Sequence, residues 1–348
     1  MIKNPFNLTF GKQPKYFIPR PEETMQIIED FTDDEPSTQL YLITGPRGSG
    51  KTVLMSAVSN KIKEDKDWIV IPLSPYSDLQ KSFITQLYQS AGSLSHSIKS
   101  KLKLSYDKIG VEMESQSAPS EINADLLEVL TDLQRRNKKV LVKIDEVNNS
   151  TEVIRFMSSF SMFIQENLPV FLIATGLQEN IESLQNTKSL TFLYRARKIT
   201  LTPLNLAGIA RVYKNEFNLR PDQAAEMAKL TKGYSYAFQV LGYFTYENRG
   251  NYMSSLSRCQ EYLNDYVYEK IWPELSEKDK QIVIATVKSK SNMTKDIREY
   301  LDMQPNEFSP YKARLIKKGL VDGEQRGKIV FSLPFFENFV ADKILYFD

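Results

Sequence analysis

The chain has 348 residues, of which 41% are hydrophobic and 25% charged, and its formal net charge is +2. This length exceeds one ordinary hydrophobic core and predicts two or three domains. Because the chain is nearly neutral, binding to a nucleic acid would need a local basic patch. The only cysteine, Cys259, and the only histidine, His96, exclude an internal disulfide and a metal centre built from several such residues.

The N-terminal stretch MIKNPFNLTFGKQPKYF contains lysines but no continuous apolar core of signal-peptide length. No stretch approaches the roughly 20 apolar residues of a membrane span. We therefore expect a cytoplasmic protein with no membrane partner.

Short runs rich in β-branched residues alternate with longer helical patterns between residues 38 and 202. The runs are LYLIT (Leu40–Thr44), WIVIPL (Trp68–Leu73), VLVKID (Val140–Asp145), VFLIAT (Val170–Thr175) and RKITL (Arg197–Leu201). Near-continuous apolar strands separated by helices indicate a parallel sheet that is covered on both faces. We predict an α/β, doubly wound, five-stranded core, which together with an N-terminal lead segment occupies residues 1–202.

The segment Gly92–Ser120 lies between the second and third predicted strands. Its middle, KLKLSYDKIGVEME, alternates at period two around a turn near Asp107–Gly110 and predicts a β-hairpin insertion with serine-rich flanks. His96 falls in this polar stretch, where we interpret it as a surface residue.

The sequence after the core predicts two further domains. Residues 203–272 are helical throughout and are expected to form an all-α lid, with the aromatic stretch YSYAFQVLGYFTYE as packing core. Residues 273–348 follow the order helix, helix, turn, helix, hairpin, helix, which is typical of a winged helix-turn-helix. In its third helix, Ser309 is expected to be the N-cap and Pro310 the first helical residue.

A glycine-rich loop after the first strand matches the pattern G-x-x-x-x-G-K-[ST]. Glycines let backbone N–H groups surround a phosphate, Lys51 adds a point charge, and the Thr52 hydroxyl suits Mg²⁺. The helix that follows directs its N-terminal dipole at the same anion. The residues expected to bind the nucleotide here are Gly45, Pro46, Arg47, Gly48, Ser49, Gly50, Lys51, Thr52 and Val53.

Two acidic residues, Asp145 and Glu146, close the third predicted strand. Asp145 is expected to reach the Mg²⁺ ion and Glu146 to orient and deprotonate the attacking water, which would make the protein an ATP hydrolase. Thr175, at the end of the fourth strand, is a candidate for sensing the γ-phosphate. Arg195 and Arg197 precede the fifth strand, where one of them is a candidate arginine finger for a neighbouring subunit; a solvated basic corner is the alternative.

With these residues, the chain resembles the AAA+ and STAND-related P-loop ATPases, especially the branch near archaeal and eukaryotic origin-recognition initiators. The resemblance covers the lead segment, core, lid and winged helix, and it implies ATP or ADP with Mg²⁺ as the ligands. The stretch FGKQPKYFIPRPEE resembles the lead-in of that family, which implies base contacts by Phe17 and Ile18. Initiators usually carry a lid arginine at the γ-phosphate, whereas the matching stretch KGYSYAFQVLG places Tyr236 there. A tyrosine is uncharged at neutral pH, so this departure favours a slow nucleotide switch.

The predicted winged helix leaves two interpretations open. Between Lys312 and Lys328 the local charge is +4, and the wing tip QRGK suits phosphate contacts, whereas residues 291–348 as a whole hold equal numbers of basic and acidic residues. The candidate contacts to duplex DNA are Ser309, Arg314, Lys317, Arg326 and Lys328. A joint that binds protein is the alternative.

Three functions therefore compete. The first is an ATPase that couples nucleotide state to DNA through the winged helix, with assembly of subunits through the arginine finger. The second is a slow regulatory switch whose winged helix binds protein. The third is a scaffold that does not hydrolyse ATP, for which Asp145 and Glu146 would have to be idle.

Overall fold

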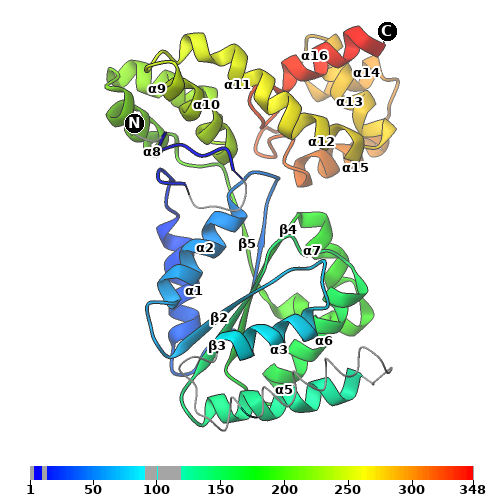
Figure 1. Cartoon of the computed structure of the whole chain (residues 1–348). Helices are drawn as coiled ribbons and strands as arrows, with labels where there is room; N and C mark the ends of the chain where they lie inside the picture. Colours follow the sequence, from blue (N-terminus) through cyan, green and yellow to red (C-terminus); the bar gives the residue numbers. More distant parts are fainter. Residues whose placement is uncertain (1–3, 10–13, 91–99, 101–118, 348) are drawn as a thin grey trace. The chain divides into compact units, whose positions relative to one another are not determined.

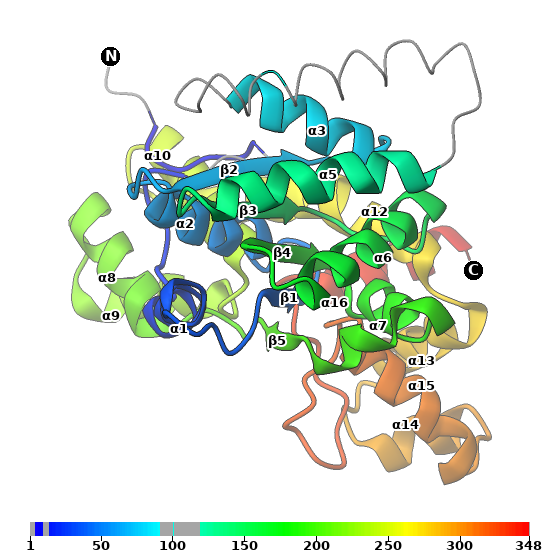
Figure 2. The same cartoon turned by 90° about the horizontal axis from the view of Figure 1, so that it is seen from below.

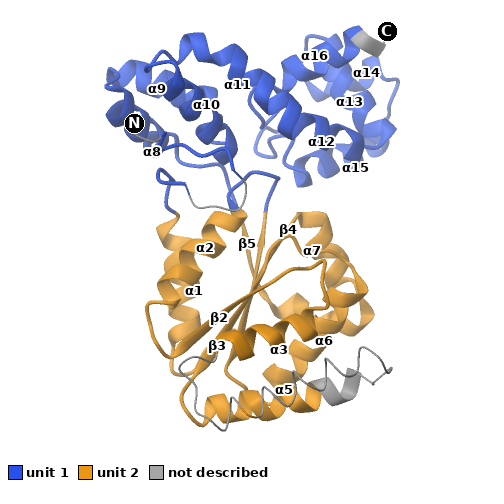
Figure 3. Cartoon of the chain, viewed as in Figure 1, with its two compact units in different colours: residues 1–19, 45–50, 201–348 blue, residues 20–44, 51–200 orange. Residues whose placement is uncertain are grey.

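The computed structural model of the chain describes residues 4–9, 14–90, 100 and 119–347. They form two compact units, which are coloured separately in Figure 3. We call residues 20–44 and 51–200 the sheet unit, and residues 1–19, 45–50 and 201–348 the helical unit. The expected hairpin insertion and His96 lie outside the described residues. Within those residues, no helix combines the length and the apolar character that crossing a bilayer requires.

The sheet unit is built on five parallel strands in the order β2-β3-β4-β1-β5. The strands are β1 (Leu40–Thr44), β2 (Trp68–Leu73), β3 (Lys139–Ile144), β4 (Val170–Gly176) and β5 (Arg197–Thr200). All residues of β1 and β4 are buried, as expected for central strands covered on both faces. The α/β fold predicted from the sequence is confirmed, with strand ends that differ by at most one residue.

Helices cover both faces of this sheet (Figures 1 and 2). One face is covered by α1 (Pro21–Thr32) and α2 (Lys51–Ile62). The other is covered by α3 (Leu79–Ser90), α5 (Pro119–Gln134) and α6 (Thr151–Gln165), which pack their apolar side chains on the strands. Helix α7 (Gln178–Gln185) and the 3₁₀ segment Lys188–Arg195 then lead to β5.

The first part of the helical unit is a bundle whose core is aromatic. Its helices are α8 (Leu206–Phe217), α9 (Pro221–Leu230), α10 (Ser235–Glu247), α11 (Leu256–Leu263) and α12 (Glu269–Ile271), with 3₁₀ turns at Met253–Ser255 and Trp272–Glu274 and a π-helical turn at Asn264–Tyr268. Tyr213 of α8 and Phe238 of α10 are buried against each other, with ring centroids 5.3 Å apart. The aromatic stretch of the predicted lid therefore packs the bundle.

The second part of the helical unit comprises α13 (Glu277–Lys288), α14 (Thr294–Tyr300), α15 (Pro305–Lys317) and α16 (Phe336–Phe347). Within the predicted hairpin between α15 and α16, the described residues form one isolated antiparallel bridge, Val321 with Phe331. A second bridge joins Lys328 of this segment to Met293, which precedes α14. Helix α15 begins five residues earlier than predicted: Pro305 is its first residue, and Gln304 and Glu307 form a capping box there. The helix order agrees with a winged helix-turn-helix, which stays an interpretation.

Candidate functional site

The carboxyl ends of β1, β3 and β4 meet at one edge of the sheet. Thr44 is in register with Gly176, and Ile144 with Ala174, so the residues that follow the three strands are neighbours. Polar side chains gather at this edge because parallel strands in this order bring them together. The Thr44 hydroxyl is fully buried here and finds no hydrogen-bond partner within the described part of the chain. A buried polar atom of this kind fits an edge that receives a polar ligand.

The Asp145 carboxylate is the centre of this edge. The Thr52 hydroxyl, from the first turn of α2, donates a hydrogen bond of 2.7 Å to Asp145 Oδ2. The hydroxyl of Thr175, which is fully buried at the end of β4, donates to Asp145 Oδ1. Both oxygens of the carboxylate are therefore fixed by residues of neighbouring elements. Thr52 and Asp145 are the hydroxyl and carboxylate ligands that Mg²⁺ takes beside nucleotide phosphates, so the residues present fit that ion.

Glu146 lies directly after Asp145 in a conformation that is unusual for a residue with a side chain. Its φ is +57°, and its N–H donates to the Thr175 hydroxyl at 3.2 Å. The next N–H, of Val147, donates to the Thr175 carbonyl at 2.8 Å. This left-handed turn costs about 1–3 kcal/mol and is compensated by the surrounding bonds. The result is an exposed carboxylate that is anchored through its backbone beside Asp145.

The Thr175 hydroxyl is thus engaged twice, because it donates to Asp145 and accepts from the Glu146 N–H. In this arrangement it connects β4 to both acidic residues. Its predicted contact with a γ-phosphate stays a prediction.

Lys51 is the first residue of α2, and it is only 9% exposed. A lysine that is buried at a helix N-terminus adds its charge to the positive end of the helix dipole. This combination suits a multiply charged anion. Thr52 and Val53 follow in the first turn of the same helix.

The loop Gly45–Gly50 precedes Lys51 in the chain and packs within the helical unit. Gly48 and Gly50 have φ values of +70° and +96°, which residues with a side chain rarely adopt. The Ser49 hydroxyl is buried and has no hydrogen-bond partner among the residues that the structure describes. Backbone of this conformation with an orphaned buried hydroxyl fits the phosphate-binding loop predicted from the sequence.

Arg47 projects from this loop and forms an ion pair of 2.6 Å with Glu274, beyond α12. Both side chains are about two-fifths exposed. Pro46, the preceding residue, lies against Gly319 after α15: a Cβ on that glycine would be 2.0 Å from the proline ring. No local sequence pattern signals either contact, because the partners are more than 200 residues away.

The lead segment lies on α8 and α10. The Tyr16 hydroxyl donates to Glu216 at 2.7 Å, and the Gln239 amide donates to the Tyr16 carbonyl at 2.7 Å. Phe17 is half-buried, and Ile18 lies against Gly208 at the start of α8. Their predicted contact with a base stays a prediction.

Tyr236 of α10 is buried, and its hydroxyl donates to the Leu8 carbonyl at 3.2 Å. Burial is the main reason that its pKa lies well above the ordinary value. The side chain is therefore a neutral hydrogen-bond donor where the initiators that the sequence resembles carry an arginine, and it is directed at the lead segment.

The two candidate arginine fingers differ. Arg197 forms an ion pair of 2.9 Å with Asp30 of its own unit and donates to the Ser37 hydroxyl at 3.3 Å. The Tyr41 hydroxyl also donates to Asp30, and burial together with this bond raises the pKa of Tyr41 to about 12. Arg195 is exposed at the end of the 3₁₀ segment. Of the pair, Arg195 is thus the better candidate for a finger.

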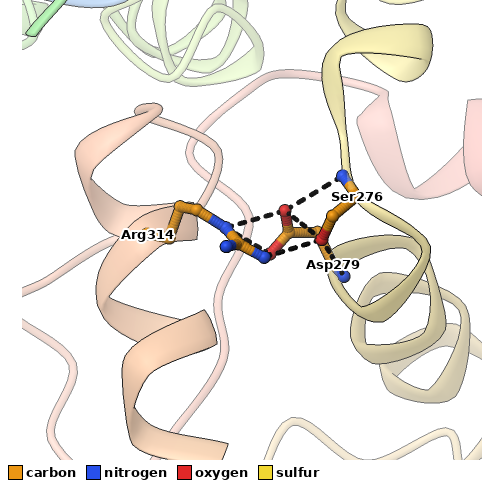
Figure 4. A network of polar contacts seen from close by, with 3 residues as sticks. All are labelled: Ser276, Asp279 and Arg314. Carbon is orange, nitrogen blue, oxygen red and sulfur yellow. Dashed lines mark hydrogen bonds and ion pairs between the residues drawn. The ribbon is translucent and has the colours of Figure 1, made fainter. Parts of the chain in front are cut away.

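The basic residues of α15 also differ in what they contact. The Arg314 guanidinium turns to α13, where it donates to both carboxylate oxygens of Asp279 at 2.8–3.0 Å and to the Ser276 hydroxyl (Figure 4). Arg314, a predicted DNA contact, is thus bound to α13, and its contact with DNA stays a prediction. The Ser309 hydroxyl donates to the Pro305 carbonyl at 2.7 Å, so it is not an N-cap. Ser309, Lys317 and Arg326 are exposed and Lys328 is half-buried.

Two parts of the chain match models of known protein families. Residues 17–171 match a family model described as an ATPase domain predominantly from Archaea, and residues 265–340 match one described as a domain of unknown function. A search of curated proteins found no match.

Solved structures resemble the chain over nearly its whole length. The Walker-type ATPase PABY2304 of Pyrococcus abyssi is 18% identical, with a TM-score of 0.67 over 93% of this chain and 96% of that one. The Aeropyrum pernix ORC2 protein, in ADPNP–ADP complexes, is 13% identical, with a TM-score of 0.63 over 97% and 98%. At these identities the likeness shows the fold alone. The chain has an α/β P-loop ATPase fold, and its residues 17–171 match an ATPase domain.

Proposed function

We propose that the protein binds ATP with Mg²⁺ and hydrolyses it. The observation that carries this proposal is the Asp145 carboxylate, which is held by the hydroxyls of Thr52 and Thr175 at the edge where β1, β3 and β4 end. Thr52 and Asp145 would hold the Mg²⁺ ion, which neutralises phosphate charge when bound. The loop Gly45–Gly50, Lys51, Thr52 and Val53 would hold the phosphates. The ADPNP–ADP complexes of the Aeropyrum ORC2 protein support a nucleotide as the ligand.

Glu146 is the residue that we assign to the water. Its carboxylate is exposed, so water reaches it, and its backbone is fixed to Thr175 beside Asp145. A carboxylate held in this way orients a water molecule and accepts its proton as the water attacks the γ-phosphorus. Lys51 places its charge against the phosphate oxygens.

Two substitutions separate binding from turnover. Glu146→Gln keeps the size and the backbone anchor but removes the base, so we expect ATP affinity to stay and turnover to fall by about 10²–10⁴-fold. Lys51→Ala removes the charge that holds the phosphates, so we expect both affinity and turnover to fall. Calorimetric titration measures the affinity, and phosphate release measures the turnover. Turnover at the wild-type rate in the Glu146→Gln protein would remove Glu146 from the mechanism.

A slow regulatory switch is the second candidate, and Tyr236 favours it. The initiators that this sequence resembles carry an arginine in the lid, whereas this chain has the neutral Tyr236 there. The Tyr236 hydroxyl donates to the Leu8 carbonyl. Without that charge, the lid has a weaker means of telling ATP from ADP. Purification distinguishes the candidates: ADP that survives gel filtration indicates the switch, whereas fast exchange with steady turnover indicates the ATPase.

We also propose that the C-terminal region binds duplex DNA through Ser309, Lys317, Arg326 and Lys328. Arg314 is left out because it is bound to Asp279. Arg326 is exposed and Lys328 half-buried in the segment between α15 and α16, which would serve as the wing. A protein-binding joint is the alternative for the same surface.

Salt dependence tests this proposal. If the two wing residues each neutralise a phosphate, replacing Arg326 and Lys328 by Ala should weaken binding and reduce the slope of log affinity against log salt by about 0.9 for each phosphate that is no longer neutralised. Lys229→Ala, which removes an exposed lysine of α9, is the control and should change neither. If no duplex binds at low salt, the region is a protein joint.

A further inference from the structure

Two carbonyl groups of the phosphate loop are held by the start of α10. The Tyr234 hydroxyl donates to the Arg47 carbonyl at 2.8 Å. The Tyr236 N–H donates to the Gly48 carbonyl at 3.1 Å. Both contacts lie inside the helical unit, which contains residues 45–50 and 201–348. The loop is therefore fixed by the lid at two successive peptide groups.

The direction of one carbonyl determines the direction of the next N–H. In a trans peptide the carbonyl of one residue and the N–H of the following residue point in opposite directions. Because Tyr234 holds the Arg47 carbonyl, the Gly48 N–H is turned to the other side of the loop. The Ser49 N–H is used within the loop, where it donates to the Pro46 carbonyl at 3.3 Å. Tyr234 thus selects the orientation of the Arg47–Gly48 peptide.

The packing around Tyr234 makes this contact specific. Its side chain is buried, and burial raises its pKa well above the ordinary value, so the hydroxyl keeps its proton and remains a donor. A Cβ on Gly48 would lie 2.3 Å from the Tyr234 hydroxyl oxygen. Glycine is therefore required at this position for the close approach of the tyrosine, in addition to the positive φ.

We propose that Tyr234 is a positioning residue for nucleotide binding: its hydroxyl fixes the Arg47–Gly48 peptide so that the Gly48 N–H faces the β-phosphate. The proposal deepens the proposed function and rests on it. Because the tyrosine belongs to the lid, the same bond ties the conformation of the lid to the occupancy of the loop. By reciprocity, a nucleotide that prefers the fixed loop strengthens the contact with the lid.

The test removes a single oxygen atom. Tyr234→Phe should weaken ADP binding by about three- to tenfold, which is the value of one hydrogen bond. It should leave AMP affinity unchanged, because AMP lacks the β-phosphate. Tyr213→Phe is the matched control, since the Tyr213 hydroxyl is also buried in the lid and donates to a backbone carbonyl, that of Phe238, at 2.7 Å. This control should lower thermal stability but leave ADP affinity unchanged.

The outcomes separate this inference from the function on which it rests. If the wild type binds ADP and Tyr234→Phe binds it equally, or loses ADP and AMP affinity to the same extent, the positioning role is wrong and nucleotide binding stands. If the wild type binds no ADP, both the positioning role of Tyr234 and the proposed nucleotide binding are wrong. Hydrogen exchange on the wild type needs no variant: ADP should slow exchange of the Tyr236 amide, which donates to the loop, and unchanged exchange would overturn the proposal.

Discussion

Asp279 shows how a single residue decides what its neighbours can do. Its carboxylate is buried within α13, where it forms a capping box with Ser276 and receives the guanidinium of Arg314. A buried carboxylate needs such partners because its desolvation is otherwise uncompensated. Arg314 therefore holds α15 on α13 through its Nε and one terminal nitrogen of its guanidinium.

Removing the Arg314 side chain, the partner of Asp279, should destabilise the folded state. We expect Arg314→Ala to lower the free energy of unfolding by about 2–4 kcal/mol, because the Asp279 carboxylate stays buried without its cation. The figure is below the range for a fully buried pair, since the Arg314 side chain is 42% exposed. Urea unfolding measures it.

The control for Arg314→Ala is Arg220→Ala. Arg220 pairs with Asp222 while both side chains are about 70% exposed, so the loss should stay below about 1 kcal/mol. Equal losses for the two variants would show that the Arg314–Asp279 pair contributes no more than a surface pair.

At the scale of elements, the sequence predicted what depends on neighbours along the chain. Strand ends, the glycine loop and the positions of Asp145, Glu146 and Thr175 all follow from local pattern, and the sheet order then brings the three residues together. The phosphate-loop helix begins at Lys51 as the motif requires.

Contacts between distant elements could not be predicted in this way. Arg197 meets Asp30, and Tyr234 meets the Arg47 carbonyl, across more than 150 residues of sequence. The local sequence around Arg197 and Tyr234 does not indicate which residue either one contacts. The sequence therefore does not distinguish Arg197 from Arg195, and it does not predict the contact of Tyr234 with the loop.

The prediction of where α15 starts was wrong for a different reason. Two prolines, Pro305 and Pro310, both suit the first position of a helix, and both are preceded by a polar residue. The structure uses the earlier one, because Gln304 and Glu307 complete a capping box there, and Pro310 lies inside the helix. The Ser309 hydroxyl then donates to the carbonyl four residues back instead of capping. Competing local signals of similar strength leave a helix boundary undecided.

At the scale of the whole molecule, the chain passes between the two units several times, since the lead segment and the loop 45–50 pack with residues 201–348. The predicted boundaries after residues 202 and 272 describe the order of the sequence and stay predictions. Assembly of several copies would add a further level, because an arginine of one copy can complete the site of another. Arg195 is the candidate, as it is exposed while Arg197 is paired with Asp30.

A mixing experiment tests that arrangement. Glu146→Gln lacks the base but keeps its arginine, and Arg195→Ala lacks the arginine but keeps its base, so each protein alone should turn over ATP slowly. If the arginine acts between copies, a mixture contains sites in which the intact Glu146 of one copy meets the intact Arg195 of another, and activity should rise above the sum of the separate proteins. This gain should grow with protein concentration, measured as phosphate release.

Arg195→Ala mixed with Lys51→Ala should recover activity likewise, because the defects again lie in different copies. Strict additivity at every concentration would show that Arg195 serves no neighbouring site, and would leave it as a solvated residue at the end of its 3₁₀ segment.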